Sequence, residues 1–102
     1  MSILHIVNKS PYDRNSLETC LRLAQPGSAI LLIEDGVYAL RSRSSAADTL
    51  AETIGDRPLY ALEPDMKARG LSTDALIDRV ELVDYEGFVR LTTEYDKVQS
   101  WL

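Results

Sequence analysis

Ile3-Leu4-His5-Ile6-Val7, followed by Asn8-Lys9-Ser10-Pro11, is the stretch that decides the architecture of this chain. The first five residues form a short apolar run rich in β-branched side chains, with no alternation of polar and apolar positions. This pattern is typical of a strand that is buried on both faces, as strands in parallel sheets are. The turn-forming residues that follow end the strand. The chain therefore begins with a central strand of a sheet covered on both sides.

Three further apolar runs follow, and segments of helical composition separate them. The predicted strands are 3–7, 28–33, 58–62 and 80–84; the predicted helices are 15–24, 46–54, 65–69, 72–78 and one that begins at Tyr85, with a helical turn beginning at 36–40. Strands that alternate with helices favour a parallel sheet with right-handed crossovers. We therefore predict an α/β fold: a single small domain over residues 1–102, with an open, mostly parallel, twisted sheet and helices on both faces.

Composition narrows the classes of function. The chain has 102 residues, a net charge of −5, one cysteine and one histidine. The negative charge argues against direct nucleic-acid binding. One cysteine and one histidine provide neither an internal disulfide nor the usual ligands of a structural zinc site, and we predict no metal and no cofactor. The sequence contains no basic, apolar leader and no apolar run of bilayer length, so a cytoplasmic protein with no membrane association is expected.

Acidic residues gather where the predicted strands end. In an open parallel sheet, sites form beyond the carboxyl ends of the strands. The carboxylates at these ends are Glu34, Asp35, Glu63, Asp65, Asp84 and Glu86. Such groups can act as acid and base or bind a hard cation, but capping helices and ending strands is their commoner use, and we favour it. No glycine-rich phosphate loop follows the first strand, so nucleotide binding has no support.

Three single residues allow two interpretations each. Cys20 lies at helical spacing with Leu17, Leu21 and Ala24, so it is either a packing residue or a reactive thiol, which needs exposure and a lowered pKa. His5, inside an apolar strand, fits a core histidine better than a catalytic one. Trp101 either folds back onto the core of its own chain or anchors a neighbouring subunit.

Several blocks taken together resemble the DsrH/TusB family of sulfur-relay subunits. The blocks are Leu4-His5-x-Val7-Asn8-Lys9-Ser10-Pro11, Arg14-Asn15-Ser16-Leu17-Glu18-x-Cys20-Leu21, Glu34-Asp35-Gly36-x-Tyr38, Asp65-x-Lys67-Ala68-Arg69-Gly70, Val83-Asp84-Tyr85-x-Gly87-Phe88-Val89-x-Leu91-Thr92 and Val98-Gln99-x-Trp101. Each block is weak alone, whereas their order and spacing along the whole chain make a strong match.

The resemblance implies a DsrE/F/H-like fold and a place in a cytoplasmic heterohexamer with two sister chains, DsrE/TusD-like and DsrF/TusC-like. Such complexes relay persulfide sulfur to a downstream acceptor protein, toward either 2-thiolation of the tRNA wobble uridine or dissimilatory sulfur oxidation. The principal cysteine belongs to the DsrE/TusD-like sister and lies where a helix begins after a strand, ahead of an Arg-Gly pair. The corresponding stretch here, Leu62-Glu63-Pro64-Asp65 ahead of Arg69-Gly70, has no thiol.

The missing thiol leads to our main hypothesis, a non-principal subunit that builds assembly surface and is not catalytic alone. Cys20 matches a cysteine of the DsrH branch, so we predict it as a candidate auxiliary persulfide carrier. An alternative enzyme hypothesis has this chain transfer sulfur by itself through Cys20. A third hypothesis is a stand-alone homo-oligomeric binding protein with a ligand site at the acidic strand ends.

Overall fold

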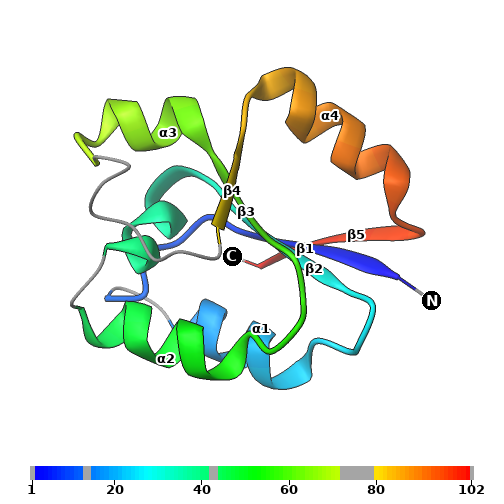
Figure 1. Cartoon of the computed structure of the whole chain (residues 1–102), viewed down its shortest axis with the longest axis horizontal. Helices are drawn as coiled ribbons and strands as arrows, with labels where there is room; N and C mark the ends of the chain where they lie inside the picture. Colours follow the sequence, from blue (N-terminus) through cyan, green and yellow to red (C-terminus); the bar gives the residue numbers. More distant parts are fainter. Residues whose placement is uncertain (1, 13–14, 42–43, 72–79, 102) are drawn as a thin grey trace.

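The apolar runs of the sequence form one parallel sheet with helices against both faces in the computed structural model, which describes residues 2–12, 15–41, 44–71 and 80–101 (Figure 1). The elements in chain order are β1 (Ile3–Val7), α1 (Ser16–Leu23), β2 (Ala29–Leu32), the 3-10 helix η1 (Glu34–Leu40), α2 (Ser45–Thr53), β3 (Leu59–Leu62), α3 (Glu63–Ala68), β4 (Val80–Val83), α4 (Tyr85–Glu94) and β5 (Lys97–Trp101). The predicted fold class is confirmed.

The five strands lie in the order β4-β3-β2-β1-β5, and every neighbouring pair is parallel. Val7, the last residue of β1, stands opposite Leu32 of β2 and Trp101 of β5. Because all strands run in the same direction, their carboxyl ends meet at one edge of the sheet. The carboxylates that the sequence places after β2, β3 and β4 therefore lie along that edge, beside η1, α3 and the start of α4.

Successive residues of each strand point to opposite faces, so the side chains of β1 are part of two separate cores. On one face, Val7 packs in a cluster with Leu17 of α1 and Leu50 of α2. On the other face, Leu4 and Ile6 pack in a cluster that contains Leu91 of α4. Figure 1 shows α1 and α2 on one side of the sheet and α4 on the other. This double burial explains why β1 and β2 are apolar without alternation.

The fifth strand differs from the sequence prediction, which ended the chain with a helix and a tail. Helix α4 ends at Glu94, and Lys97–Trp101 then joins β1 at the edge of the sheet. The strand escaped prediction because an edge strand needs no continuous apolar run, and all of its residues except Trp101 are exposed. Trp101 itself packs against the core on the α1/α2 face, as the first of its two interpretations states.

Several helix ends follow local chemistry. The Ser44 side chain accepts a hydrogen bond from the amide of Ala47 at 3.1 Å and so caps α2. Helix α3 carries Pro64 in its first turn and ends before Gly70, whose φ of 69° suits glycine. Asn15 precedes α1 but makes no capping bond with its side chain. The predicted helix at 72–78 lies outside the described residues.

Within the described ranges no helix has the length and apolarity that crossing a bilayer requires.

Candidate functional site

Cys20 lies in the middle of α1 and is fully buried, with 0% of its surface exposed. Its neighbours in the core cluster include Leu17 and Leu21 of its own helix, so the apolar face predicted from the spacing is the face that packs on the sheet. Burial raises the pKa of the Cys20 thiol to about 12, and the positive charge of Arg57 offsets only part of that effect. In this conformation the sulfur is protonated and shielded from solvent, which is the environment of an unreactive thiol.

The junction of β3 and α3 is the second location that the sequence singled out. Helix α3 begins at Glu63, directly after the last residue of β3, so this junction lies at the carboxyl edge of the sheet. Its side chains bear carboxylates where the resemblance places a sister subunit's thiol. Asp65 accepts a hydrogen bond from the amide of Glu34 at 2.6 Å. The carboxylate of Asp65 therefore ties α3 to the start of η1.

Arg69 completes this arrangement at the carboxyl edge. Its Nε donates to Oδ1 of Asp35 at 2.9 Å, and its Nη1 donates to the backbone carbonyl of Asp65 at 3.1 Å. At the neighbouring strand end, the Asp84 side chain accepts from the amide of Gly87 at 2.8 Å and caps α4. Asp65 and Asp84 thus act as backbone caps, which is the use that the sequence favoured. The described residues contain no cluster of three metal-ligating side chains.

Arg57 lies at the opposite, amino-terminal edge of the sheet. It lies just before β3, and its guanidinium donates to the carbonyl oxygens of Leu21 at 3.1 Å, Ala24 at 2.8 Å and Ile54 at 2.9 Å, and to that of Thr53. These carbonyls lie at the carboxyl ends of α1 and α2, where backbone acceptors lack helical partners and the helix dipole is negative. One cation therefore closes two helix ends. Sequence reasoning missed this role, because backbone acceptors leave no trace in residue identity.

His5 and Trp101 form a polar contact inside the α1/α2 core. The indole Nε1 of Trp101 donates to Nδ1 of His5 at 3.0 Å. An indole can only donate, so Nδ1 of His5 is unprotonated and the neutral ring carries its proton on Nε2. Nε2 is buried and has no hydrogen-bond partner among the described residues. Burial and the charge of Arg57 both lower the pKa of His5. The predicted core histidine is present, with only one of its nitrogens satisfied.

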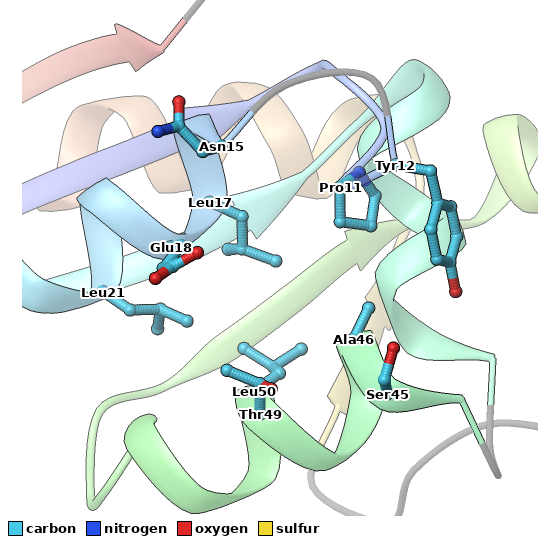
Figure 2. A pocket seen from close by; sticks show the side chains of 10 residues that line it. All are labelled: Pro11, Tyr12, Asn15, Leu17, Glu18, Leu21, Ser45, Ala46, Thr49 and Leu50. Atoms are coloured by element: carbon cyan, nitrogen blue, oxygen red, sulfur yellow. The ribbon is translucent and has the colours of Figure 1, made fainter.

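A surface cleft opens between α1 and α2 beside the loop that follows β1 (Figure 2). Its volume is about 390 Å³. The lining residues are Pro11, Tyr12, Asn15, Leu17, Glu18, Leu21, Ser45, Ala46, Thr49 and Leu50. No pattern in the sequence predicts this cleft, because it depends on how two helices separated by a strand lie side by side.

Comparison with known proteins places the chain among named relatives. The family described as "DsrH like protein" matches residues 9–98. A protein named TusB from Pectobacterium parmentieri is 36% identical over 99 residues, covering 97% of this chain and 100% of that protein. A protein of the same name from Escherichia coli (strain K12 / DH10B) is 34% identical over 101 residues, with the same coverage of both chains.

Solved structures share the fold. The crystal structure of the ychN protein from E. coli superimposes with a TM-score of 0.80 and 26% identity, covering 99% of both chains. MTH1491 from Methanobacterium thermoautotrophicum, described as a protein of unknown function, superimposes with a TM-score of 0.71 and covers 96% of both chains. At 20% identity, that second likeness concerns the fold alone.

Proposed function

Since this chain belongs to the DsrH/TusB family, we propose that it is a non-principal subunit of a sulfur-relay complex. In this proposal the whole chain, residues 1–102, acts as one domain in a cytoplasmic hetero-oligomer with DsrE/TusD-like and DsrF/TusC-like sister chains. The complex passes persulfide sulfur to an acceptor protein, in the service of either tRNA thiolation or sulfur oxidation. The chain provides assembly surface, and a sister provides the principal sulfur-carrying thiol.

The observation that carries this proposal is that the cysteine does not lie at the accessible end of a strand. The one cysteine of the chain is fully buried, whereas the β3–α3 junction is accessible and bears carboxylates. A persulfide needs a cysteine sulfur, and its anionic form is repelled by carboxylates such as Glu63 and Asp65. The β3–α3 junction is therefore unsuited to carrying a persulfide. Cys20 has the sulfur that a persulfide needs, but it is buried.

Cys20 remains the candidate for an auxiliary sulfur acceptor. Because its thiol is buried, it must become exposed before it can accept sulfur. In such a step the Cys20 thiolate attacks the terminal sulfur of a sister's persulfide, that sulfur moves to Cys20, and the sister's cysteine leaves as a thiolate. The sulfane sulfur is transferred without any net oxidation. Because the resting thiol is buried and has a pKa of about 12, the step requires α1 to move away from the sheet.

Co-purification tests the assembly proposal. The chain is co-expressed with both sister chains from the same genome and isolated through a tag on one sister. We expect all three chains to elute as one species in size-exclusion chromatography. If this chain elutes alone while the two sisters associate with each other, the proposal is wrong.

Mass spectrometry after incubation with a persulfide donor tests the division of labour. We expect one added sulfur atom on the DsrE/TusD-like sister and none on Cys20 of the isolated chain. A sulfur adduct on Cys20 only within the assembled complex would support the auxiliary role. Robust sulfur transfer by the isolated chain would overturn the non-principal assignment in favour of the enzyme hypothesis.

A further inference from the structure

The cleft between α1 and α2 has an apolar floor and a polar rim. Leu17, Leu21 and Leu50 form the buried floor, and each is also part of the core on this face. Tyr12 stands at the rim with 62% of its surface exposed, so its ring is available to a partner. Figure 2 shows Tyr12 beside the start of α2 and Glu18 on the opposite wall, on α1.

The polar groups of the cleft do not suit a small-molecule ligand. Pockets for small molecules place a few buried polar groups so that they converge on the ligand. Here Asn15, Glu18, Ser45 and Thr49 are all exposed, and the residues beneath them are apolar. An apolar centre with a solvated polar rim is instead the anatomy of a protein interface.

The charge of the cleft indicates which charged group a protein partner would place there. Glu18 is the only charged residue among the described residues that line the cleft. The ion pairs among the described residues are Lys67–Glu63, Arg69–Asp35, Arg69–Asp65 and Arg90–Glu94, and none involves Glu18. An exposed carboxylate at the rim of a cleft attracts a cationic group of a partner and repels the phosphates of a nucleic acid. The exposed ring of Tyr12 adds a face on which a guanidinium can stack.

We propose that this cleft is the docking site for a segment of a sister subunit that inserts an apolar side chain onto the leucine floor and presents an arginine to Glu18. The inference rests on the proposed function, because it names the surface through which this chain joins its complex. Arginine fits better than lysine, since its planar guanidinium can pair with a carboxylate through two parallel hydrogen bonds. The apolar insertion provides affinity, and the ion pair fixes the orientation.

Two variants at the cleft and two matched controls test the proposal. Thr49→Trp fills the cleft from α2, and Glu18→Lys reverses the charge of its rim; both positions are exposed, so the fold should tolerate the changes. Ala51→Trp and Glu52→Lys make the same kinds of change at exposed positions of α2 that do not line the cleft. Affinity for the purified pair of sister chains is measured by biolayer interferometry, and circular dichroism checks that each variant folds.

We expect each cleft variant to weaken binding about tenfold or more, as substitutions at interface hot spots do, and each control to stay within about twofold of the wild type. Replacing the partner's arginine by glutamate should restore binding to Glu18→Lys. If the wild type binds and the folded cleft variants bind equally well, the inference is wrong and the proposed function stands. If the wild type does not bind the sister pair, the proposed function fails and the inference with it.

Discussion

The two ends of the sheet are each closed by an arginine, but in different ways. At the amino end, Arg57 donates to backbone carbonyls that end α1 and α2. At the carboxyl end, Arg69 joins the carboxylate of Asp35 and lies 4.0 Å from that of Asp65. Backbone acceptors at helix ends are fixed by the fold, whereas carboxylates at the surface are screened by water and can rearrange. The amino end is therefore a structural clamp, and the carboxyl end is the more adaptable edge.

Sulfur chemistry would need features that this chain keeps at separate places. Cys20 lies on the α1/α2 face, within the electrostatic reach of Arg57, where the packing excludes solvent. The edge that holds Arg69 is partly exposed, and its described side chains include the carboxylates of Asp35 and Glu63 but no thiol. The accessory role that we propose follows from the placement of the thiol as much as from the number of cysteines.

A thiol moved to the carboxyl edge should become reactive. In Glu63→Cys combined with Cys20→Ala, the single thiol occupies a position whose native side chain is 42% exposed. Because burial raises the pKa of Cys20 from 9.0 to about 12, its thiolate is about a thousandfold scarcer at neutral pH than that of an ordinary cysteine. We expect labelling with a disulfide reagent to be at least about a thousandfold faster in the variant than in the wild type.

The denaturant dependence of labelling provides the control for this first experiment. If Cys20 reacts only when α1 opens, its labelling rate should rise steeply with urea, while that of Glu63→Cys should stay flat. Equal rates in the native proteins would show that the Cys20 sulfur is reachable, and the contrast between the two regions would be lost.

Among the glycines, Gly36 at the carboxyl edge is the one where an added side chain would meet the backbone most closely. A Cβ atom on Gly36 would lie 2.3 Å from the carbonyl oxygen of Val7, and neither backbone can shift easily, because Val7 is hydrogen-bonded to Ile33. We expect Gly36→Ala to lower the free energy of unfolding by about 3 kcal/mol or more, measured by urea denaturation.

Gly55→Ala is the matched comparison at the other end of the sheet. Gly55 has a φ of 60°, but a Cβ atom there meets nothing within 4 Å. Its replacement should cost about 1 kcal/mol, the strain of a left-handed backbone alone. If both variants lose the same stability, the close approach of η1 to β1 is not a constraint.

Much of the fold could be predicted because its signals are local. Apolar runs located β1 to β4, and helical spacing placed Cys20 on the inner face of α1. The strand β5 was missed because its partner is β1, more than ninety residues earlier, and its own residues are largely polar and exposed. Pairing across such a distance leaves no local pattern to recognise.

The functional surfaces were harder to predict because they arise from juxtaposition. The sequence identified Cys20 as ambiguous, and only the packing of α1 on the sheet decides that its thiol is buried. The cleft between α1 and α2 needs two helices that β2 separates in sequence. Arg57 gave no signal, because a lone arginine before a strand has no motif. Local rules thus define elements, and contacts between elements define sites.

Replacing each of the two arginines in turn should show that Arg57 contributes more to the free energy of unfolding than Arg69. Arg57→Met keeps an apolar stem but removes the guanidinium that donates to the carbonyls of Leu21 and Ala24, so we expect a loss of about 2 kcal/mol in the free energy of unfolding. Arg69→Met removes partly exposed ion pairs and one hydrogen bond to the carbonyl of Asp65, so it should cost about 1 kcal/mol, less than Arg57→Met. Urea denaturation of both variants measures the difference. A larger loss for Arg69→Met would reverse the assignment of clamp and adaptable edge.

The smallest expected effect is a pH dependence that arises from His5. Its pKa in the folded chain is lowered from 6.5, first by burial and then by Arg57, so the unfolded chain takes up the proton more readily. The stabilisation is therefore present above pH 6.5 and is lost as the pH falls from there toward the folded value. Protonation of Nδ1 would also oppose the indole N–H of Trp101, which donates to that atom.

His5→Gln isolates this contribution, because it removes the titrating group from the strand. Between pH 7.5 and pH 5.5 the wild type should lose about 1 kcal/mol more stability than the variant, within the limit of about 1.4 kcal/mol per pH unit for one group. Trp101 is the single tryptophan, so its fluorescence during urea denaturation reports unfolding at the contact itself. Arg57→Met should reduce the pH dependence, since it removes the cation that disfavours protonated His5. An identical pH profile for the wild type and His5→Gln would mean that His5 does not contribute to the pH dependence, and an unchanged profile in Arg57→Met would mean that the arginine and the histidine are not coupled.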